Sequence, residues 1–254
     1  MSPLAARSAS RAPSPRAAVG FLTRLPVGGG ALTAAQLSRS ALWFPAVGLL
    51  VGGVMAGVHA LAGTVLDATP ATVLALLAAM LVTGALHEDG LADAADAIGA
   101  HVPRERRLEI LRDSRVGTYG ALALVFCVLF ALAVLAPLDD GDFLRAALVG
   151  HAVGRWSILP QSLLLAPARP DGAGALMRAG TATTAVATAY TIAIALVAGR
   201  PAAGAVALGV AALLTALGVV LFRRTLGGAT GDTFGALVKV VELGCYAALV
   251  AMWA

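Results

Sequence analysis

The feature that most constrains this chain is a series of seven long apolar segments. They lie at about 42–66, 70–87, 119–138, 144–166, 181–199, 202–222 and 235–253. A bilayer crossing needs ~20 apolar residues, and seven crossings would use more than half of the chain. Charged residues make up only 13% of the sequence, about half the usual share of a soluble domain. We therefore predict an all-α, polytopic membrane bundle of about seven transmembrane helices, and exclude a soluble, disordered or disulfide-stapled protein.

The distribution of arginine predicts the orientation of this bundle. With the N-terminus in the cytoplasm, most arginines fall in cytoplasmic loops, as the positive-inside rule requires. Orientation also explains the net charge of +4, so no nucleic-acid partner is inferred. The basic residues 1–20 are expected to form a flexible tail, and 21–254 a single membrane-embedded catalytic domain. Both polar loops, 87–118 and 223–234, would then face the cytoplasm together.

An acidic run follows the second apolar segment. On a helix, Asp89, Asp93 and Asp96 would point from one face, where their like charges repel. A divalent cation would relieve this repulsion, and hard oxygen ligands suit Mg²⁺. Gly90 would leave space for a bulky group beside Asp89. The alternative is a solvated helix end, but ionisable residues bordering a membrane segment are functional candidates. His87 precedes the run and could act as a base or orient one.

A basic stretch, 104–120, continues the first polar loop. Its arginines could bind a metal-bound polyphosphate, since guanidinium contacts phosphate through two donors. Orientation alone accounts equally well for Arg104 to Arg107. Arg112, Asp113 and Arg115 are more specific, because they precede a turn and the next helix, whose N-terminus could bind an anion.

The second polar loop contains Asp232 within a glycine-rich turn. Asp232 could simply cap the following helix, but its expected side of the membrane favours a contribution to the same site. Glu242, inside the next apolar segment, is costly unless it is paired or serves a site, and Lys239 is its nearest partner.

Several motifs in order resemble the cobalamin synthase family, whose members are adenosylcobinamide-GDP ribazoletransferases. These motifs are Thr23-Arg24-Leu25-Pro26-Val27, Phe44-Pro45-Ala46-Val47-Gly48, residues 83–93, residues 113–120, and residues 230–236 with Glu242. The resemblance covers the chain from about residue 20 onward. Glu88 departs from it, because the family more often has an apolar residue there.

The resemblance implies that adenosylcobinamide-GDP and α-ribazole, or its 5′-phosphate, give adenosylcobalamin, or its phosphate, and GMP, with Mg²⁺ as cofactor. It also implies a bacterial inner-membrane protein whose active site faces the cytoplasm. A homo-oligomer, or association with other late cobalamin enzymes, is conjecture.

Combining the residue patterns with this chemistry assigns three groups of site residues. The catalytic group is His87, Asp89, Asp93, Arg112 and Arg115, with either His87 or a carboxylate as the base. The cofactor- and substrate-binding group is Gly90, Asp113, Ser114, Gly117 and Asp232. The metal ligands are Glu88, Asp89, Asp93 and Asp96.

The same carboxylate-rich pattern could serve two other functions. A CDP-alcohol phosphotransferase also places carboxylates at a membrane surface, but the carboxylate spacing here differs from its pattern. A cation-coupled transporter would carry acidic residues near the middle of its spans, whereas here they gather at one surface.

Overall fold

The computed structural model describes residues 13–28 and 32–254, and this part of the chain is helical, with one isolated β-bridge between Pro167 and Ala229. Its helices are α1 (Pro15–Leu22), α2 (Ala34–Ser40), the 3-10 turn η1 (Ala41–Trp43), α3 (Phe44–Gly63), α4 (Ala68–Thr83), α5 (Leu86–Gly99), α6 (Arg104–Ile110), α7 (Thr118–Leu135), α8 (Asp140–Trp156), α9 (Ile158–Leu164), α10 (Ala173–Leu176), α11 (Thr181–Ala198), α12 (Pro201–Leu226) and α13 (Gly231–Trp253). The predicted all-α, polytopic membrane bundle is confirmed.

Fewer helices than predicted are long and apolar enough to cross a membrane. Within the described residues there are five such segments, or six if the bent pair α4 and α5 counts as one span. The predicted span 144–166 is not among them, because it is divided at Ser157 into α8 and α9. Arg155 in α8 is almost fully buried, so protein rather than lipid surrounds this segment.

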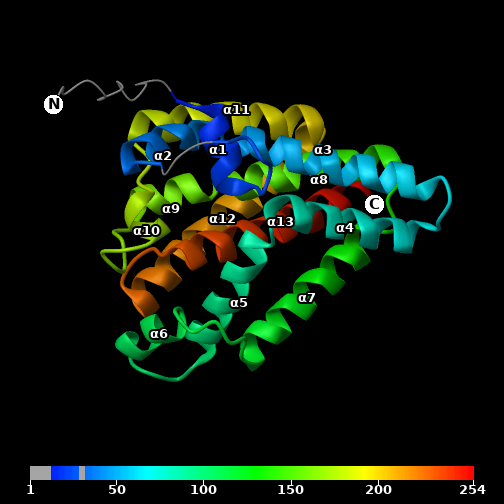
Figure 1. Ribbon diagram of the computed structural model, residues 1–254. Helices are drawn as coiled ribbons and strands as arrows, with labels where there is room; N and C mark the ends of the chain where they lie inside the picture. The colour runs from blue at the N-terminus through cyan, green and yellow to red at the C-terminus, as the bar shows by residue number, and fades with distance from the viewer. Residues whose placement is uncertain (1–12, 29–31) are drawn as a thin grey trace.

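The bundle has a protein-covered centre and a lipid-facing periphery. In α13, 72% of the most apolar window is buried inside the structure, whereas only 17% of that in α11 is. Figure 1 shows α8 and α13 running through the middle of the bundle, with α3 and α11 on one side. The close approach of α3 to α8 depends on Gly48 and Gly52, since a Cβ at either would lie within 2.5 Å of an α8 carbonyl oxygen.

A sharp bend between α4 and α5 positions the acidic run. Gly84 and Ala85 are consecutive left-handed residues, with φ of 64° and 55°, and the two helices meet at 89°. The N-terminal segment supports this bend: the backbone amide of Arg24 donates to the carbonyl of Val82 over 2.7 Å. The Arg24 side chain covers Gly84 so closely that a Cβ there would lie 2.4 Å from its Nε.

The expected tail 1–20 overlaps an ordered helix. Residues 15–20 belong to α1, in which Ala18 and Leu22 are buried in the core, so the bundle begins before residue 21. Ser14 caps this helix by accepting from the amide of Ala17. Residues 1–12 lie outside the described part.

Candidate active site

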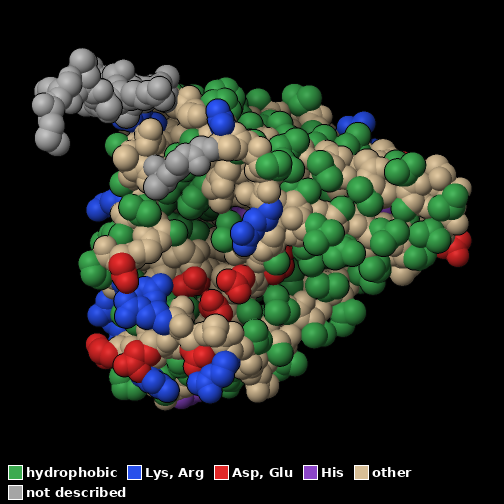
Figure 2. Space-filling view, viewed as in Figure 1, with side chains coloured by type: hydrophobic (Ala, Val, Ile, Leu, Met, Phe, Trp, Pro, Cys, Tyr) green, Lys and Arg blue, Asp and Glu red, His purple; other side chains and the backbone are tan. Residues whose placement is uncertain are grey.

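The acidic run forms the predicted helix. All three aspartates at the predicted spacing lie on α5, which begins directly after the bend. Asp89 is exposed, Asp93 and Asp96 are half-buried, and His87 is only 3% exposed. In Figure 2, acidic and basic side chains gather at the end of the bundle near α5, α6 and α10, while apolar side chains cover much of the remaining visible face.

The second polar loop packs directly against the start of α5, as the sequence predicts. A Cβ on Gly90 would lie 2.8 Å from the carbonyl oxygen of Asp232 and 3.1 Å from the Cα of Gly235. Gly90 therefore permits a helix contact rather than the approach of a ligand group to the backbone. The cap of α13 is Thr230, in a capping box with Thr233, so Asp232 lies in the first turn instead of capping it.

A cavity of about 300 Å³ opens where these elements meet. His87, Asp89, Gly90 and Asp232 contribute to its polar wall, together with Arg169, which the sequence analysis did not single out. The remaining lining residues are Phe21, Leu22, Leu86, Ile158, Gly172, Ala173, Gly231, Phe234 and Gly235. The structure thus brings four of the predicted site residues into one cavity, and most of its other lining residues are apolar or glycine.

Backbone pairing between two distant loops brings Arg169 to this cavity. The amide of Ala168 donates to Ala229, and the amide of Ala229 donates to Ala166, each over 2.8 Å. Arg104 contacts both loops, because its Nε donates to the carbonyl of Leu226 over 2.8 Å and its Nη2 donates to the carbonyl of Ala168 over 3.3 Å. Arg169 then lies 3.5 Å from the carboxylate of Asp232. Only the fold reveals this position, because no local motif marks Arg169.

Two of the four carboxylates predicted as metal ligands have other partners. Glu88 is buried, and its Oε1 lies 3.1 Å from Nζ of Lys239. Asp96 accepts from the amides of Gly117 and Gly120, at 2.7 and 2.9 Å, and so caps the start of α7. The backbone amide of Gly117, a residue predicted to bind cofactor or substrate, therefore already donates to Asp96.

The residues predicted on the 112–115 turn do not line the cavity. Arg112 pairs with Asp171 at 3.1 Å, and Arg115 pairs with Asp113 at 2.6 Å. The Arg115 guanidinium holds the pKa of Asp113 at about 2, below its ordinary value. The side chain of Arg115 is 87% exposed, and Ser114 is also exposed. The Arg112 contact with Asp171 connects this turn to the loop that carries Arg169, although the turn itself does not line the cavity.

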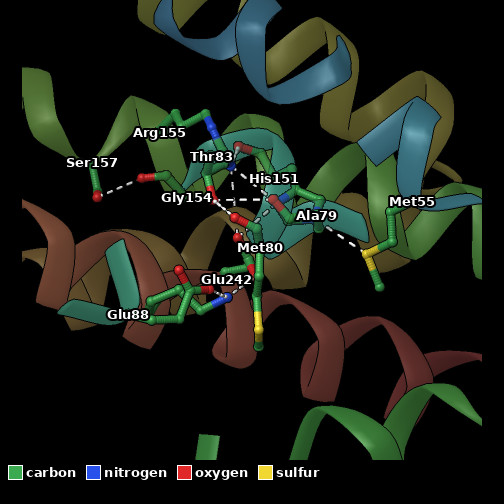
Figure 3. Close-up of polar contacts among 11 residues, drawn as sticks. Met55, Ala79, Met80, Thr83, Glu88, His151, Gly154, Arg155, Ser157 and Glu242 are labelled. Carbon is green, nitrogen blue, oxygen red and sulfur yellow. Dashed lines mark hydrogen bonds and ion pairs between the residues drawn. The ribbon is translucent and has the colours of Figure 1, made fainter. Parts of the chain in front are cut away.

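A buried ionic network lies behind the acidic helix (Figure 3). Glu242 lies 2.5 Å from Lys239, 2.8 Å from Nδ1 of His151 and 3.7 Å from Arg155. Lys239 continues the network to Glu88. The pairing of Glu242 with Lys239 agrees with the sequence interpretation, and His151 is a further partner that the sequence did not indicate. The network connects α5, α8 and α13.

The remaining carboxylates suit one mode of Mg²⁺ binding. Among the described residues, no three His, Cys, Asp or Glu side chains lie close enough to coordinate one ion directly. Mg²⁺, however, usually keeps several waters and binds through one or two carboxylates and substrate phosphates. Asp89, Asp93 and Asp232 supply such oxygens on facing elements, and no ion pair within the described structure involves Asp89 or Asp93.

Together, the helical bundle and its polar cavity define a polytopic membrane protein with one acidic site near an end of its helices. The chain belongs to the cobalamin-5-phosphate synthase family, whose family model matches residues 14–250.

Its relatives cover most of its length. It is 41% identical to the adenosylcobinamide-GDP ribazoletransferase of Azorhizobium caulinodans, over 89% of this chain and 91% of the relative. The proteins of the same name from Mesorhizobium japonicum and Roseiflexus sp. are 42% and 37% identical, over 88% and 91% of this chain and 87% of each relative. No solved structure matches the chain significantly.

Proposed function

We propose that this protein is an adenosylcobinamide-GDP ribazoletransferase that joins α-ribazole, or its 5′-phosphate, to the phosphocobinamide group and releases GMP. The family and the names of the relatives support this activity. The structural observation that supports it is the cavity lined by Asp89, Asp232 and Arg169, with Arg169 3.5 Å from Asp232. Carboxylates and a guanidinium in one cavity suit a diphosphate and its counter-ion.

In the proposed reaction, a ribazole hydroxyl oxygen bonds to the phosphorus that carries cobinamide. The bond from this phosphorus to the bridging oxygen breaks, and GMP leaves with that oxygen. His87 accepts the hydroxyl proton: it lines the cavity, and its buried Nε2 has no hydrogen-bond partner within the described structure. A substrate hydroxyl would be this missing partner.

Arg169 takes the charge-stabilising role that the sequence analysis gave to Arg112 and Arg115. It is largely buried and already faces a carboxylate, so its charge is less screened than that of the exposed arginines. Mg²⁺ held through one or two of the carboxylates of Asp89, Asp93 and Asp232, together with waters, would supply further neutralisation of the diphosphate.

We further propose that the protein lies in the bacterial inner membrane with this cavity toward the cytoplasm. The positive-inside rule supports this side, because arginines are concentrated in the loops around the cavity. Phosphorylated substrates that are made in the cytoplasm could then reach the cavity without crossing the bilayer.

The test is GMP release by the purified protein in liposomes, with adenosylcobinamide-GDP, α-ribazole and Mg²⁺. We expect release that requires both ribazole and the metal. Asp89→Asn should lower it at least ~100-fold. Asp67→Asn is the matched control, because Asp67 is exposed and its side chain makes no capping bond. A folded wild-type protein that releases no GMP with any divalent metal would overturn the proposal.

A further inference from the structure

The apolar lining of the cavity comes from four separate elements. Phe21 and Leu22 lie at the end of α1, Leu86 at the start of α5, Ile158 on α9 and Phe234 in the first turn of α13. The polar groups of the cavity stand on α5, on α13 and on the loop that carries Arg169. The cavity therefore offers both an apolar part, made by these five side chains, and a charged part.

The two aromatic rings of the apolar part are held in place before any ligand binds. The ring of Phe21 stacks on that of the buried Phe44, with 5.8 Å between centroids and 11° between planes. Phe234 follows the capping box of Thr230 and Thr233, which fixes the first turn of α13. A preformed apolar surface of this kind lowers the entropy cost of binding a flat ring.

The size of the cavity selects between the two substrates of the proposed reaction. About 300 Å³ is at the lower end of the ~300–1,000 Å³ range of small-molecule sites. It suits a nucleoside and is too small to enclose a corrinoid with an attached nucleotide. The apolar lining residues favour the base of α-ribazole, dimethylbenzimidazole, over guanine, because its two methyl groups gain apolar contacts that the polar edge of guanine cannot make.

We propose that this cavity is the α-ribazole subsite, with the dimethylbenzimidazole base against Phe21, Ile158 and Phe234 and the ribose toward His87 and the carboxylates. This inference rests on the proposed function and adds to it which substrate the cavity binds. The corrinoid and guanosine parts of the other substrate then lie outside the cavity, and only its diphosphate reaches Arg169.

The test measures KM separately for the two substrates in the GMP-release assay. Phe234→Ala and the milder Phe21→Leu should raise the KM for α-ribazole, by roughly tenfold in the case of the alanine variant. The KM for adenosylcobinamide-GDP should stay within about twofold of wild type. Phe126→Ala is the matched control, because this phenylalanine is 63% exposed on the lipid-facing α7, and neither KM should change.

An analogue of α-ribazole provides a test that does not depend on any single variant. The wild-type protein should use the riboside of unmethylated benzimidazole with a higher KM, because the two methyl groups lose their contact with the apolar lining. Ile158→Ala should reduce this difference between the two ribosides.

The outcomes separate the subsite from the proposed function. An active wild type whose Phe21 and Phe234 variants raise the KM for adenosylcobinamide-GDP instead, or change neither KM, overturns the subsite while the function stands. A folded wild type that produces no GMP overturns both.

Discussion

Removing the charge of Lys239 tests whether the buried network is held by charge balance. The network contains two acidic side chains, Glu88 and Glu242, and two basic side chains, Lys239 and Arg155. With His151 neutral, its net charge is therefore zero. Lys239 lies 3.1 Å from Glu88 and 2.5 Å from Glu242, and none of the four charged side chains is more than 11% exposed. Lys239→Met would leave one uncompensated negative charge in this interior.

Breaking a buried ion pair by removing one partner typically costs ~3–5 kcal/mol. For a chain of this size, 1 kcal/mol corresponds to about 2–4 °C in Tm, so Lys239→Met should lower Tm by roughly 6–20 °C. The double variant Lys239→Met/Glu88→Gln removes one charge of each sign and restores the balance. Its remaining cost is lost hydrogen bonding, about 1–2 kcal/mol, or roughly 2–8 °C.

The assay is thermal unfolding in detergent, followed by tryptophan fluorescence, for the wild type, both single variants and the double variant. If charge balance stabilises the network, adding Glu88→Gln should partly restore the Tm that Lys239→Met lowers. A double variant as unstable as the lysine variant, or less stable, would refute charge balance and leave the packing of the lysine stem as the stabilising factor.

Three further predictions concern the cavity and its supports. Arg169→Ala should lower GMP release by ~100-fold or more, whereas Arg115→Ala, which removes only an exposed ion pair, should stay within about threefold of wild type in the same assay. Gly90→Val should separate α5 from α13 and cost ~1–3 kcal/mol, seen as a lower Tm together with lost activity; a variant as stable as wild type would contradict the close contact. Asp96→Ala should cost about 1–2 kcal/mol and increase hydrogen exchange at the first amides of α7, and unchanged exchange there would exclude the capping role.

Local patterns predicted the parts of the site that depend on helical spacing. The acidic face of α5 follows from the spacing of Asp89 and Asp93. The distribution of arginines predicted that Asp232 lies on the same side of the membrane as these aspartates, and Asp232 lines the same cavity as Asp89. Arg169 and Phe21 could not be found in this way. Arg169 depends on backbone pairing between residues about sixty positions apart. Phe21 stands on a helix of eight residues, of which residues 15–20 fall within the predicted tail.

For a related reason, fewer helices of the described residues than the seven predicted segments are long and apolar enough to cross a membrane. Hydropathy reports only that a segment avoids water, and does not distinguish lipid from other helices as its surroundings. The predicted span 144–166 contains Arg155, and its α8 part is surrounded by α3 and α13. The partners of Glu88 and Asp96 in the structure, Lys239 and the amides at 117 and 120, could not be predicted because they are distant in sequence.

The position of α13 in the chain has a consequence for biogenesis. A ribosome makes α5 and α8 before α13, so Glu88 and Arg155 enter the membrane before Lys239 and Glu242 are synthesised. Until α13 inserts, Glu88 and Arg155 lack the partners that Lys239 and Glu242 provide, and the cavity lacks Asp232 and Phe234. A translation product that stops short of α13 is therefore inactive and exposes polar groups that membrane quality-control proteases can detect.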